Sequence, residues 1–388
     1  MSRAKLPLLL LFALVVILGA CQSEGKIEGE VFIVTEGREN IEMGLVGVKA
    51  IEASAFEGHL KERHSQSKEE VRSLAREAAS LLDSLSVAQQ LYEERKAEYE
   101  RAQAEYSDVA KEYRMKLGSF NPSPQASKGD RVAVALERKK IILRGKPDFS
   151  SEEKGYMTSG DLGTVLDVVK DEINTFYKIE SEDSETGWTG YVGRLVEPDE
   201  DIIYSKRELE ERVGKARRLY KRVESVRSDI SSRLEDTFGQ IASYREQGYY
   251  YRDMPSAHSS SETGSDGNYE LTVEGGVPYY IVAQASRSVG DEEEHYYWMV
   301  ETTVERGETK EVNLSNDNLG GVANQGYALR ERTLSTVRAI WGSAVSLAKE
   351  GEQDWEKLIY RTAFPQDTTD APLPDGIDVP EEKLLSDR

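Results

Sequence analysis

The sequence is short of cysteine and histidine, and both shortages limit its chemistry. It has one cysteine, Cys21, and four histidines in 388 residues. If Cys21 is covalently modified, no thiol remains for a disulfide, a metal site or a nucleophile, which excludes cysteine redox chemistry. His59 and His64 are close, but a spacing of five places them on different faces of a helix, where we expect solvated side chains. We therefore predict no metal site.

Positive charge is scarce as well. The chain has 50 lysines and arginines against 71 acidic residues, for a net charge of -21. Such a chain repels phosphate backbones, which excludes nucleic acid as a partner. Hydrophobic residues make up 38% and charged residues 31%, which indicates less core than a compact enzyme of this length would have. We predict two or three structural units.

Patterns of catalytic residues are missing too. No nucleophile elbow or phosphate loop occurs, and the serines after His258 do not make a triad. Asp266-Gly267 lacks the alternating acids of a calcium loop, so we expect an ordinary hairpin turn there. We predict no catalytic residue and no cofactor, and we interpret the chain as a non-enzyme.

Residues 1–20 have the three parts of a secretory signal. Arg3 and Lys5 precede an apolar run over residues 8–18, and small residues follow. The run is too short to span a bilayer comfortably. We interpret residues 1–20 as a signal peptide.

Leu18-Gly19-Ala20-Cys21 ends this segment and resembles the lipobox at which bacterial lipoproteins are diacylated and cleaved. The resemblance implies that Cys21 is lipidated and holds the mature protein at a membrane of the cell envelope. Gln22 follows in place of Asp, which in Gram-negative lipoproteins implies the outer membrane, facing the periplasm. The alternative is an ordinary signal followed by a chance cysteine.

Two long amphipathic helices are predicted in the middle of the chain. Ser67-Lys68-Glu69-Glu70 and Ser205-Lys206-Arg207-Glu208 match the capping box that opens a helix. Apolar residues then repeat with three-four spacing, which defines two arms, residues 57–117 and 205–247. Neither arm, roughly 65 to 70 Å long, can bury its apolar stripe alone, so we predict a long antiparallel coiled-coil hairpin.

Tyr92, Tyr99, Tyr106 and Tyr113 recur every seven residues along the first arm. A ligand-stacking ladder would use such a row, but alternation with small residues explains it as core without any ligand. We interpret the tyrosines as core. Antiparallel pairing then places Tyr113 near Leu209.

Residues 128–198, between the arms, have the pattern of a small β domain. The segments that carry this pattern are Arg131-Val132-Ala133-Val134, Ile141-Ile142-Leu143-Arg144-Gly145-Lys146-Pro147, Gly160-Asp161-Leu162-Gly163-Thr164-Val165-Leu166, Phe176-Tyr177-Lys178-Ile179 and Gly187-Trp188-Thr189-Gly190-Tyr191-Val192. They resemble the bacterial Src-homology-3-like barrel, although Phe176 stands where a tryptophan is common and the usual Asn-Val-Arg segment is lacking. The resemblance implies binding of cell-wall peptide or glycan, with Phe176, Trp188 and Tyr191 as stacking contacts. Phe176 and Trp188 could equally be barrel core.

Strand patterns on either side of the arms resemble two halves of one domain. The first half is Gly29-Glu30-Val31 with its flanking strands, and the second contains Thr263-Gly264-Ser265-Asp266-Gly267-Asn268-Tyr269. Together they resemble a carboxypeptidase-regulatory-like domain, which implies a transthyretin-like β-sandwich without peptidase activity. We predict one split sandwich from residues 26–56 and 249–316.

The C-terminal part is predicted to contain an amphipathic helix over residues 327–350, which we expect to pack on the sandwich. The helical segment as a whole spans residues 327–360. Residues 365–388 hold four prolines among acids and no apolar pattern, so we expect a disordered tail.

The predicted fold is therefore multidomain α+β: a split sandwich, a coiled-coil hairpin, a small β-barrel at its tip and a C-terminal helix. Its arrangement favours a lipid-anchored binding or scaffold protein whose barrel contacts peptidoglycan or an envelope protein. The alternative is a periplasmic adaptor of a transport or secretion assembly, docking through the hairpin. The hairpins of such adaptors end in a short turn. Here about seventy β-like residues lie between the two arms, which favours a binding or scaffold protein over an adaptor.

Overall fold

The computed structural model describes residues 24–35, 38–118, 126–135, 140–190, 195–290, 292–347 and 354–365. The predicted signal peptide, Cys21 and the predicted tail beyond Pro365 lie outside these ranges. The chain divides into a terminal unit, residues 1–86 and 229–388, and a central unit, residues 87–228. The fold is mixed α+β, as predicted, with mainly antiparallel sheets. Within the described ranges, no helix is both long and apolar enough to cross a membrane.

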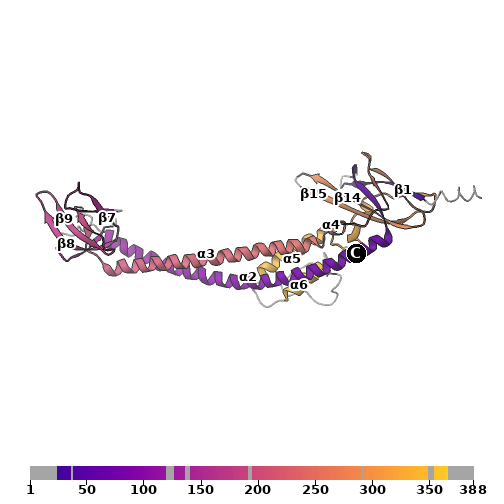
Figure 1. Ribbon diagram of the computed structural model, residues 1–388. Helices are drawn as coiled ribbons and strands as arrows, with labels where there is room; N and C mark the ends of the chain where they lie inside the picture. Colours follow the sequence, from indigo (N-terminus) through magenta and orange to yellow (C-terminus); the bar gives the residue numbers. More distant parts are fainter. Residues whose placement is uncertain are drawn as a thin grey trace, which may run out of the picture. The chain divides into compact units, whose positions relative to one another are not determined.

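Two sheets form the β part of the terminal unit. The three-stranded sheet has the order β13 (Asn268–Glu274), β1 (Glu24–Glu30), β16 (Thr309–Glu311), and the four-stranded sheet has the order β12 (Ser259–Glu262), β4 (Gly47–Glu52), β14 (Pro278–Val289), β15 (Glu292–Thr303). The short strands β2 (Phe32–Val34) and β3 (Asn40–Glu42) pair with each other. In Figure 1 the indigo β1 lies among orange strands, because β1 and β4 precede the helices in the sequence and their partners follow them.

A hydrophobic core fills the space between these two sheets. Alternate residues of β13 are buried, as a strand with one solvated face requires. Trp298 lies in this core with no exposed surface, and its indole N–H donates a 3.0 Å hydrogen bond to the Ser315 carbonyl. Buried side chains from both sheets surround it: Ile27, Val31, Val48, Tyr269, Leu271, Val273, Ile281 and Leu314.

The four-stranded sheet is also covered on its other face. Phe56 at the start of helix α2 (Ala53–Gly118) packs against Tyr280, and the short helix α4 (Gln247–Tyr250) adds Tyr250. Both faces of β14 are therefore buried, which explains its continuous run of buried residues from Tyr279 to Ala283.

One long helix pair connects to these sheets, and neither capping-box sequence marks the start of its helix. Helix α2 begins at Ala53 and helix α3 (Glu200–Ser243) begins at Glu200, so Ser67 and Ser205 lie inside helices. Ser67 is buried and donates a 2.9 Å hydrogen bond to the Tyr244 carbonyl. The capping-box sequence does not cap here because apolar packing before it continues the helix.

The helices run antiparallel in each unit. In the terminal unit, Arg233 forms a 3.4 Å ion pair with Glu77. In the central unit, Arg212 forms a 2.8 Å ion pair with Glu105.

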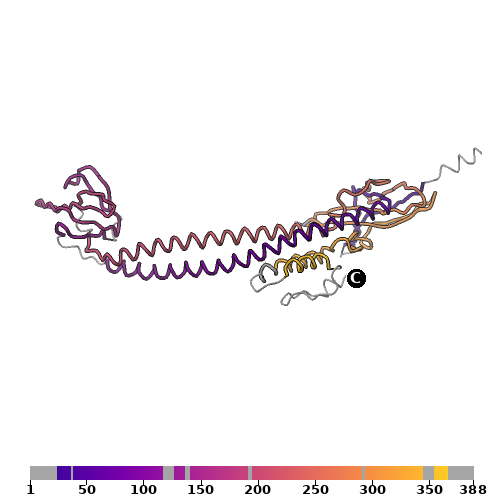
Figure 2. The backbone as a smooth tube through the Cα atoms, turned by 60° about the horizontal axis from the view of Figure 1, so that its bottom comes forward, coloured from indigo at the N-terminus to yellow at the C-terminus, as the bar shows by residue number. Residues whose placement is uncertain are grey.

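The C-terminal helices pack on the helix pair and not on the sheets, so the predicted packing is wrong. Helices α5 (Glu331–Leu347) and α6 (Trp355–Ala363), yellow in Figure 2, lie alongside α2 within the terminal unit. Trp341 is fully buried, and its ring stacks on Phe238 of α3 at 5.4 Å. Its indole N–H donates to the Thr362 hydroxyl at 2.8 Å. The apolar face of α5 thus covers a stripe that α2 and α3 leave open.

The central unit contains one curled antiparallel sheet of seven strands. Their order is β11 (Leu195–Val196), β5 (Arg131–Val134), β8 (Leu162–Lys170), β9 (Thr175–Ser181), β10 (Thr186–Thr189), β6 (Lys140–Arg144), β7 (Glu153–Thr158). Its core contains Val132, Ile141, Leu143, Val165, Tyr177 and Ile179.

A turn at Asp266-Gly267 follows the sequence prediction only in part. Gly267 has φ of +75°, as such a turn requires. The flanking strands β12 and β13, however, pair in different sheets, so the turn crosses from one sheet to the other and does not close a hairpin. Sequence pattern alone does not distinguish these two cases.

Candidate functional site

The three predicted contact residues of the central sheet have different environments. Phe176 of β9 is only 3% exposed, so it is a packing residue. Trp188 of β10 is half-buried and lies opposite Arg144 of β6 and Lys178 of β9. Tyr191 lies outside the described residues. Because Lys178 is two residues from Phe176, the structure brings Phe176 and Trp188 to one face of the sheet.

Sequence reasoning missed Phe149, an exposed aromatic residue whose ring packs against Phe176. Its ring is 41% exposed, and its centroid lies 5.0 Å from that of Phe176. A Cβ atom at Gly190 would lie 2.4 Å from the Phe149 ring, so glycine is needed there for the close approach. The sequence did contain one sign of an exposed Phe149. The preceding dipeptide, Pro147-Asp148, is typical of a turn, and turns lie at the surface.

The loop that carries Phe149 is ordered by its own hydrogen bonds. The Ser150 amide and hydroxyl donate to the Asp148 carboxylate at 3.0 and 2.7 Å, which lowers the pKa of that carboxyl. The Lys146 amide donates to the Ser151 hydroxyl at 2.9 Å. These hydrogen bonds order the loop before any ligand binds, which reduces the conformational entropy that the loop loses on binding.

Arg144 and Lys178 are the basic residues of the face, and the side chain of Arg144 is only 15% exposed. Its guanidinium donates to the Ser151 carbonyl at 2.7 Å and lies 3.7 Å from Glu153. Its Nε is buried and has no hydrogen-bond partner among the described residues. We name Arg144, Phe149, Phe176, Lys178 and Trp188 the aromatic face. Flat rings beside a guanidinium can stack on a sugar or peptide plane and bind a carboxylate.

No family model, no curated protein and no solved structure matches this chain. The candidate site therefore depends on the geometry of the described residues alone.

An ion-pair cluster fixes the central sheet to helix α3. Glu182 accepts hydrogen bonds from Tyr204 at 2.5 Å, Arg207 at 2.6 Å and Arg131 at 3.1 Å. Burial acts to raise the pKa of Glu182, but these donors hold it below its ordinary value. Arg131 also donates to Glu200 at 2.9 Å. The sheet and this part of the helix pair thus form one rigid support for the aromatic face.

Tyr92 and Tyr99 of the seam pack against α3 in the central unit, whereas Tyr113 lies in a cluster with residues of the central sheet. Tyr220 of α3 stacks on Tyr99 at 5.9 Å, and its hydroxyl lies 3.1 Å from the hydroxyl of Tyr92. This hydrogen bond raises the pKa of Tyr220 to about 12. Tyr113 is 5% exposed. These contacts favour interhelical packing over a ligand ladder.

The two neighbouring histidines are not solvated as predicted. His59 donates to the Tyr250 carbonyl at 3.0 Å, and His64 lies 3.3 Å from the Tyr250 hydroxyl. Both are half-buried against α4, which shows that the spacing of five does not separate them here. Within the described ranges, no three His, Cys, Asp or Glu side chains are placed to hold a metal ion.

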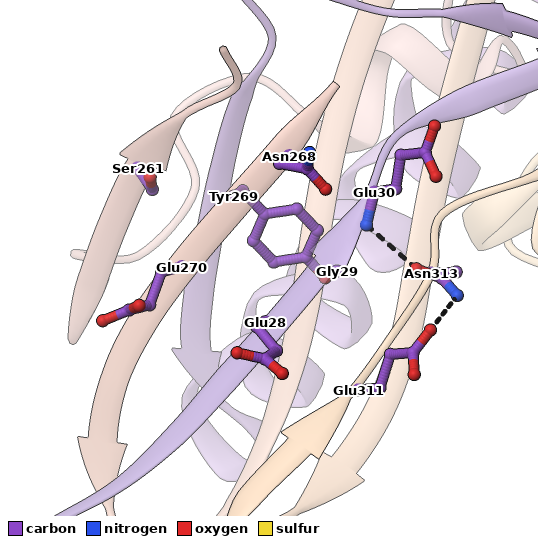
Figure 3. Close-up of a pocket in the computed structure, with 9 residues that line it drawn as sticks. All are labelled: Glu28, Gly29, Glu30, Ser261, Asn268, Tyr269, Glu270, Glu311 and Asn313. Atoms are coloured by element: carbon purple, nitrogen blue, oxygen red, sulfur yellow. Dashed lines mark hydrogen bonds between the residues drawn. The ribbon is translucent and has the colours of Figure 1, made fainter. Parts of the chain in front are cut away.

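An acidic pocket of about 520 Å³ lies on the outer face of the three-stranded sheet (Figure 3). Glu28 is directly opposite both Glu270 and Glu311, so one row across the sheet carries three like charges. Lys26 offsets part of this repulsion through a 2.8 Å ion pair with Glu270, which raises the pKa of the lysine. Asn313, two residues beyond the end of β16, lies beside this row, since it accepts from the Glu30 amide and donates to Glu311.

Proposed function

We propose that this chain is a lipid-anchored protein of the bacterial cell envelope that binds a cell-wall or envelope component through the aromatic face. In this proposal Cys21 carries the lipid, the terminal unit is a transthyretin-like sandwich, and the helix pair is a coiled-coil hairpin that presents an Src-homology-3-like barrel. Peptidoglycan is the first candidate ligand, and an envelope protein is the second.

The observation that carries the proposal is the partly exposed aromatic face. Phe149 and Trp188 offer accessible rings, and Phe176 supports Phe149 from below. Arg144 adds a guanidinium that can pair with a ligand carboxylate. Peptidoglycan supplies both partners, because it contains sugar planes and peptide carboxylates.

The binding test measures sedimentation of the purified full-length chain, in detergent, with purified peptidoglycan. Trp188→Ala and Phe149→Ala are expected to weaken binding by about thirty-fold, the size of a central aromatic contact of roughly 2 kcal/mol. Met115→Ala, which truncates an exposed apolar side chain of α2, is the matched control and is expected to bind like the wild type. Near-UV circular dichroism checks that each variant is folded.

The same sedimentation assay can contradict this part of the proposal. Equal binding by folded Phe149→Ala, Trp188→Ala and wild type would remove the aromatic face as the site. Because Phe149 is 41% exposed, its truncation is expected to cost little stability, so it separates loss of contact from loss of fold.

The anchor prediction concerns Cys21. Cells given a labelled fatty acid are expected to label the wild-type protein and not Cys21→Ser, because the thiol is the only site for the proposed acylation. The substituted protein is expected to leave the membrane fraction or to keep its signal peptide. An unlabelled wild type would reject the lipid anchor without affecting the binding test.

The second candidate function is an adaptor that docks through the helix pair. Val87 and Val226 are 65% and 47% exposed, and Leu91 is 37% exposed. They lie at one level of the pair, because Arg227 donates a 3.1 Å hydrogen bond to Gln89. In this alternative, these exposed apolar side chains provide the contact surface. Loss of function in Val87→Ala or Val226→Ala, with Trp188→Ala unaffected, would favour the adaptor.

A further inference from the structure

Strand β15 ends its sheet and has an edge that is only partly covered. It pairs with β14 over twelve residues, from Glu292 to Thr303. On its other side, Trp298 bridges Leu319, and the Gly320 amide donates to the Tyr297 carbonyl at 3.0 Å. No other described strand pairs with this side of β15, so the edge is open before Tyr297.

The bridge between Trp298 and Leu319 shows which backbone groups of β15 point away from β14. The Tyr297 carbonyl points away from β14, since it accepts from Gly320. Backbone groups alternate in direction along an antiparallel strand, so those of Glu293 and His295 point the same way as those of Tyr297. Each of these two residues offers one N–H donor and one carbonyl acceptor to an added strand.

A pocket of about 770 Å³ lies beside this edge, entirely within the terminal unit. Its apolar lining includes Ile33, Leu319 and Leu329, together with the rings of Tyr296 and Tyr297. A strand added to the edge would place alternate side chains toward this lining. The site thus offers both backbone pairing and apolar contact.

The charges around the pocket are mainly negative. Arg338 pairs with Glu246 at 2.7 Å, and Arg287 lies 4.0 Å from Glu294. Glu293 and Glu331 also line the pocket and form no ion pair with another described residue. The pocket therefore has unbalanced negative charge, which favours a partner with lysine or arginine.

Two segments of this protein are poor candidates for the added strand: β15 of a second copy, and residues 366–388. A second copy of β15 would bring further glutamates, Glu293 and Glu294, to a pocket that already has unbalanced negative charge, which is unfavourable. Residues 366–388 are acidic and contain Pro372, Pro374 and Pro380, and proline cannot donate to a sheet ladder.

We propose that the edge of β15 at residues 293–297 binds an extended basic segment of a partner protein, which adds a strand to the four-stranded sheet. This site is in the terminal unit and is independent of the aromatic face.

The test uses the full-length chain and a fluorescent octapeptide of alternating lysine and valine. We expect saturable binding by fluorescence anisotropy and slower hydrogen exchange at the amides of Glu293 and His295. The same peptide with every second amide N-methylated is expected to bind at least ten-fold more weakly, because it cannot complete a ladder. A glutamate-valine octapeptide is expected not to bind.

Two variants test the site itself. Glu293→Lys is expected to weaken binding of the lysine-valine peptide about ten-fold, whereas Glu305→Lys, with the same change of charge at an exposed position elsewhere in the unit, is expected to change it less than two-fold. His295→Pro removes one outward N–H without removing a bond to β14, and is expected to weaken binding similarly. Unfolding curves check the fold of each variant.

Three results would overturn the proposal. They are no binding of the lysine-valine peptide, equal binding of its N-methylated form, and equal weakening by Glu293→Lys and Glu305→Lys. The last two would indicate general attraction to an acidic surface. None of these results bears on the peptidoglycan assay.

Discussion

Replacing Gly29 with alanine is expected to lower the free energy of unfolding of the terminal unit by about 3 kcal/mol, through overpacking. A Cβ atom at Gly29 would lie 2.0 Å from the Val312 carbonyl oxygen and 2.7 Å from its carbon. This backbone cannot move aside without loss, because the Val312 and Leu314 amides donate to the carbonyls of Glu28 and Glu30 at 2.8 and 2.9 Å. Hydrogen exchange at the amides of β1 and β16, which belong to the terminal unit, measures the change.

Gly47→Ala is the matched control for Gly29→Ala. Gly47 also lies in a strand of the terminal unit, but no heavy atom lies within 4 Å of a Cβ atom built there. The free energy of unfolding is therefore expected to change by less than about 0.5 kcal/mol. Equal effects of the two substitutions would show that close approach to Val312 is not what requires glycine at position 29.

Trp341→Ala is expected to destabilise the packing of α5 on the helix pair by about 4 kcal/mol, because it removes a large, fully buried side chain. The contact with Phe238 and the hydrogen bond to Thr362 are lost together. Because the chain has two units and need not unfold in one step, the measurement is hydrogen exchange at α5 and α6, which is expected to become fast before exchange in the central unit changes.

Thr362→Val isolates the hydrogen bond from the packing. It keeps the size of the side chain and removes the acceptor of the Trp341 indole, so a loss of about 1 to 2 kcal/mol is expected. If the amide hydrogens of α5 exchange as slowly in Trp341→Ala as in the wild type, contacts other than those of the Trp341 ring hold the helix.

The helices illustrate what sequence pattern can and cannot predict. Three-four spacing of apolar residues indicates helix over residues 71–117 and 209–247, and the structure is helical over 71–117 and over 209–243, where α3 ends at Ser243. Neither capping box, at Ser67 or at Ser205, is where its helix begins. A capping box indicates where a helix is able to begin, and burial of residues such as Phe56 and Leu60 continues α2 to the N-terminal side of Ser67. The packing of α5 was wrong for a related reason. An amphipathic face shows that a helix is covered, but not by which element.

Short motifs in the sheets depend on long-range contacts in a similar way. The glycine of Gly29-Glu30-Val31 is needed because the Val312 backbone lies directly over it, nearly three hundred residues further along the chain. The alternation of β13 was visible in the sequence, but its pairing with β1 was not, because register depends on contacts between distant segments.

The candidate site was predictable only in its aromatic composition. Trp188 and Phe176 belong to a recognisable strand pattern, and they do share a face of the central sheet. Which of them is accessible depends on packing, and here Phe176 is buried under Phe149. Phe149 itself lies in a loop with no periodic pattern, so its position follows from hydrogen bonds such as those of Asp148 with Ser150.

The order of elements along the chain has a consequence for biosynthesis. Residues of the central unit are contiguous, whereas Lys26 and its partner Glu270 are 244 residues apart. A growing chain therefore emerges with β1 and β4 unpaired and completes the central unit before β13 exists. At usual rates of synthesis, the roughly 200 intervening residues take about 10 to 40 s to make. During that interval β1 and β4 expose edges that can aggregate, so the split order of the strands makes the unfinished chain more vulnerable than the finished sheets.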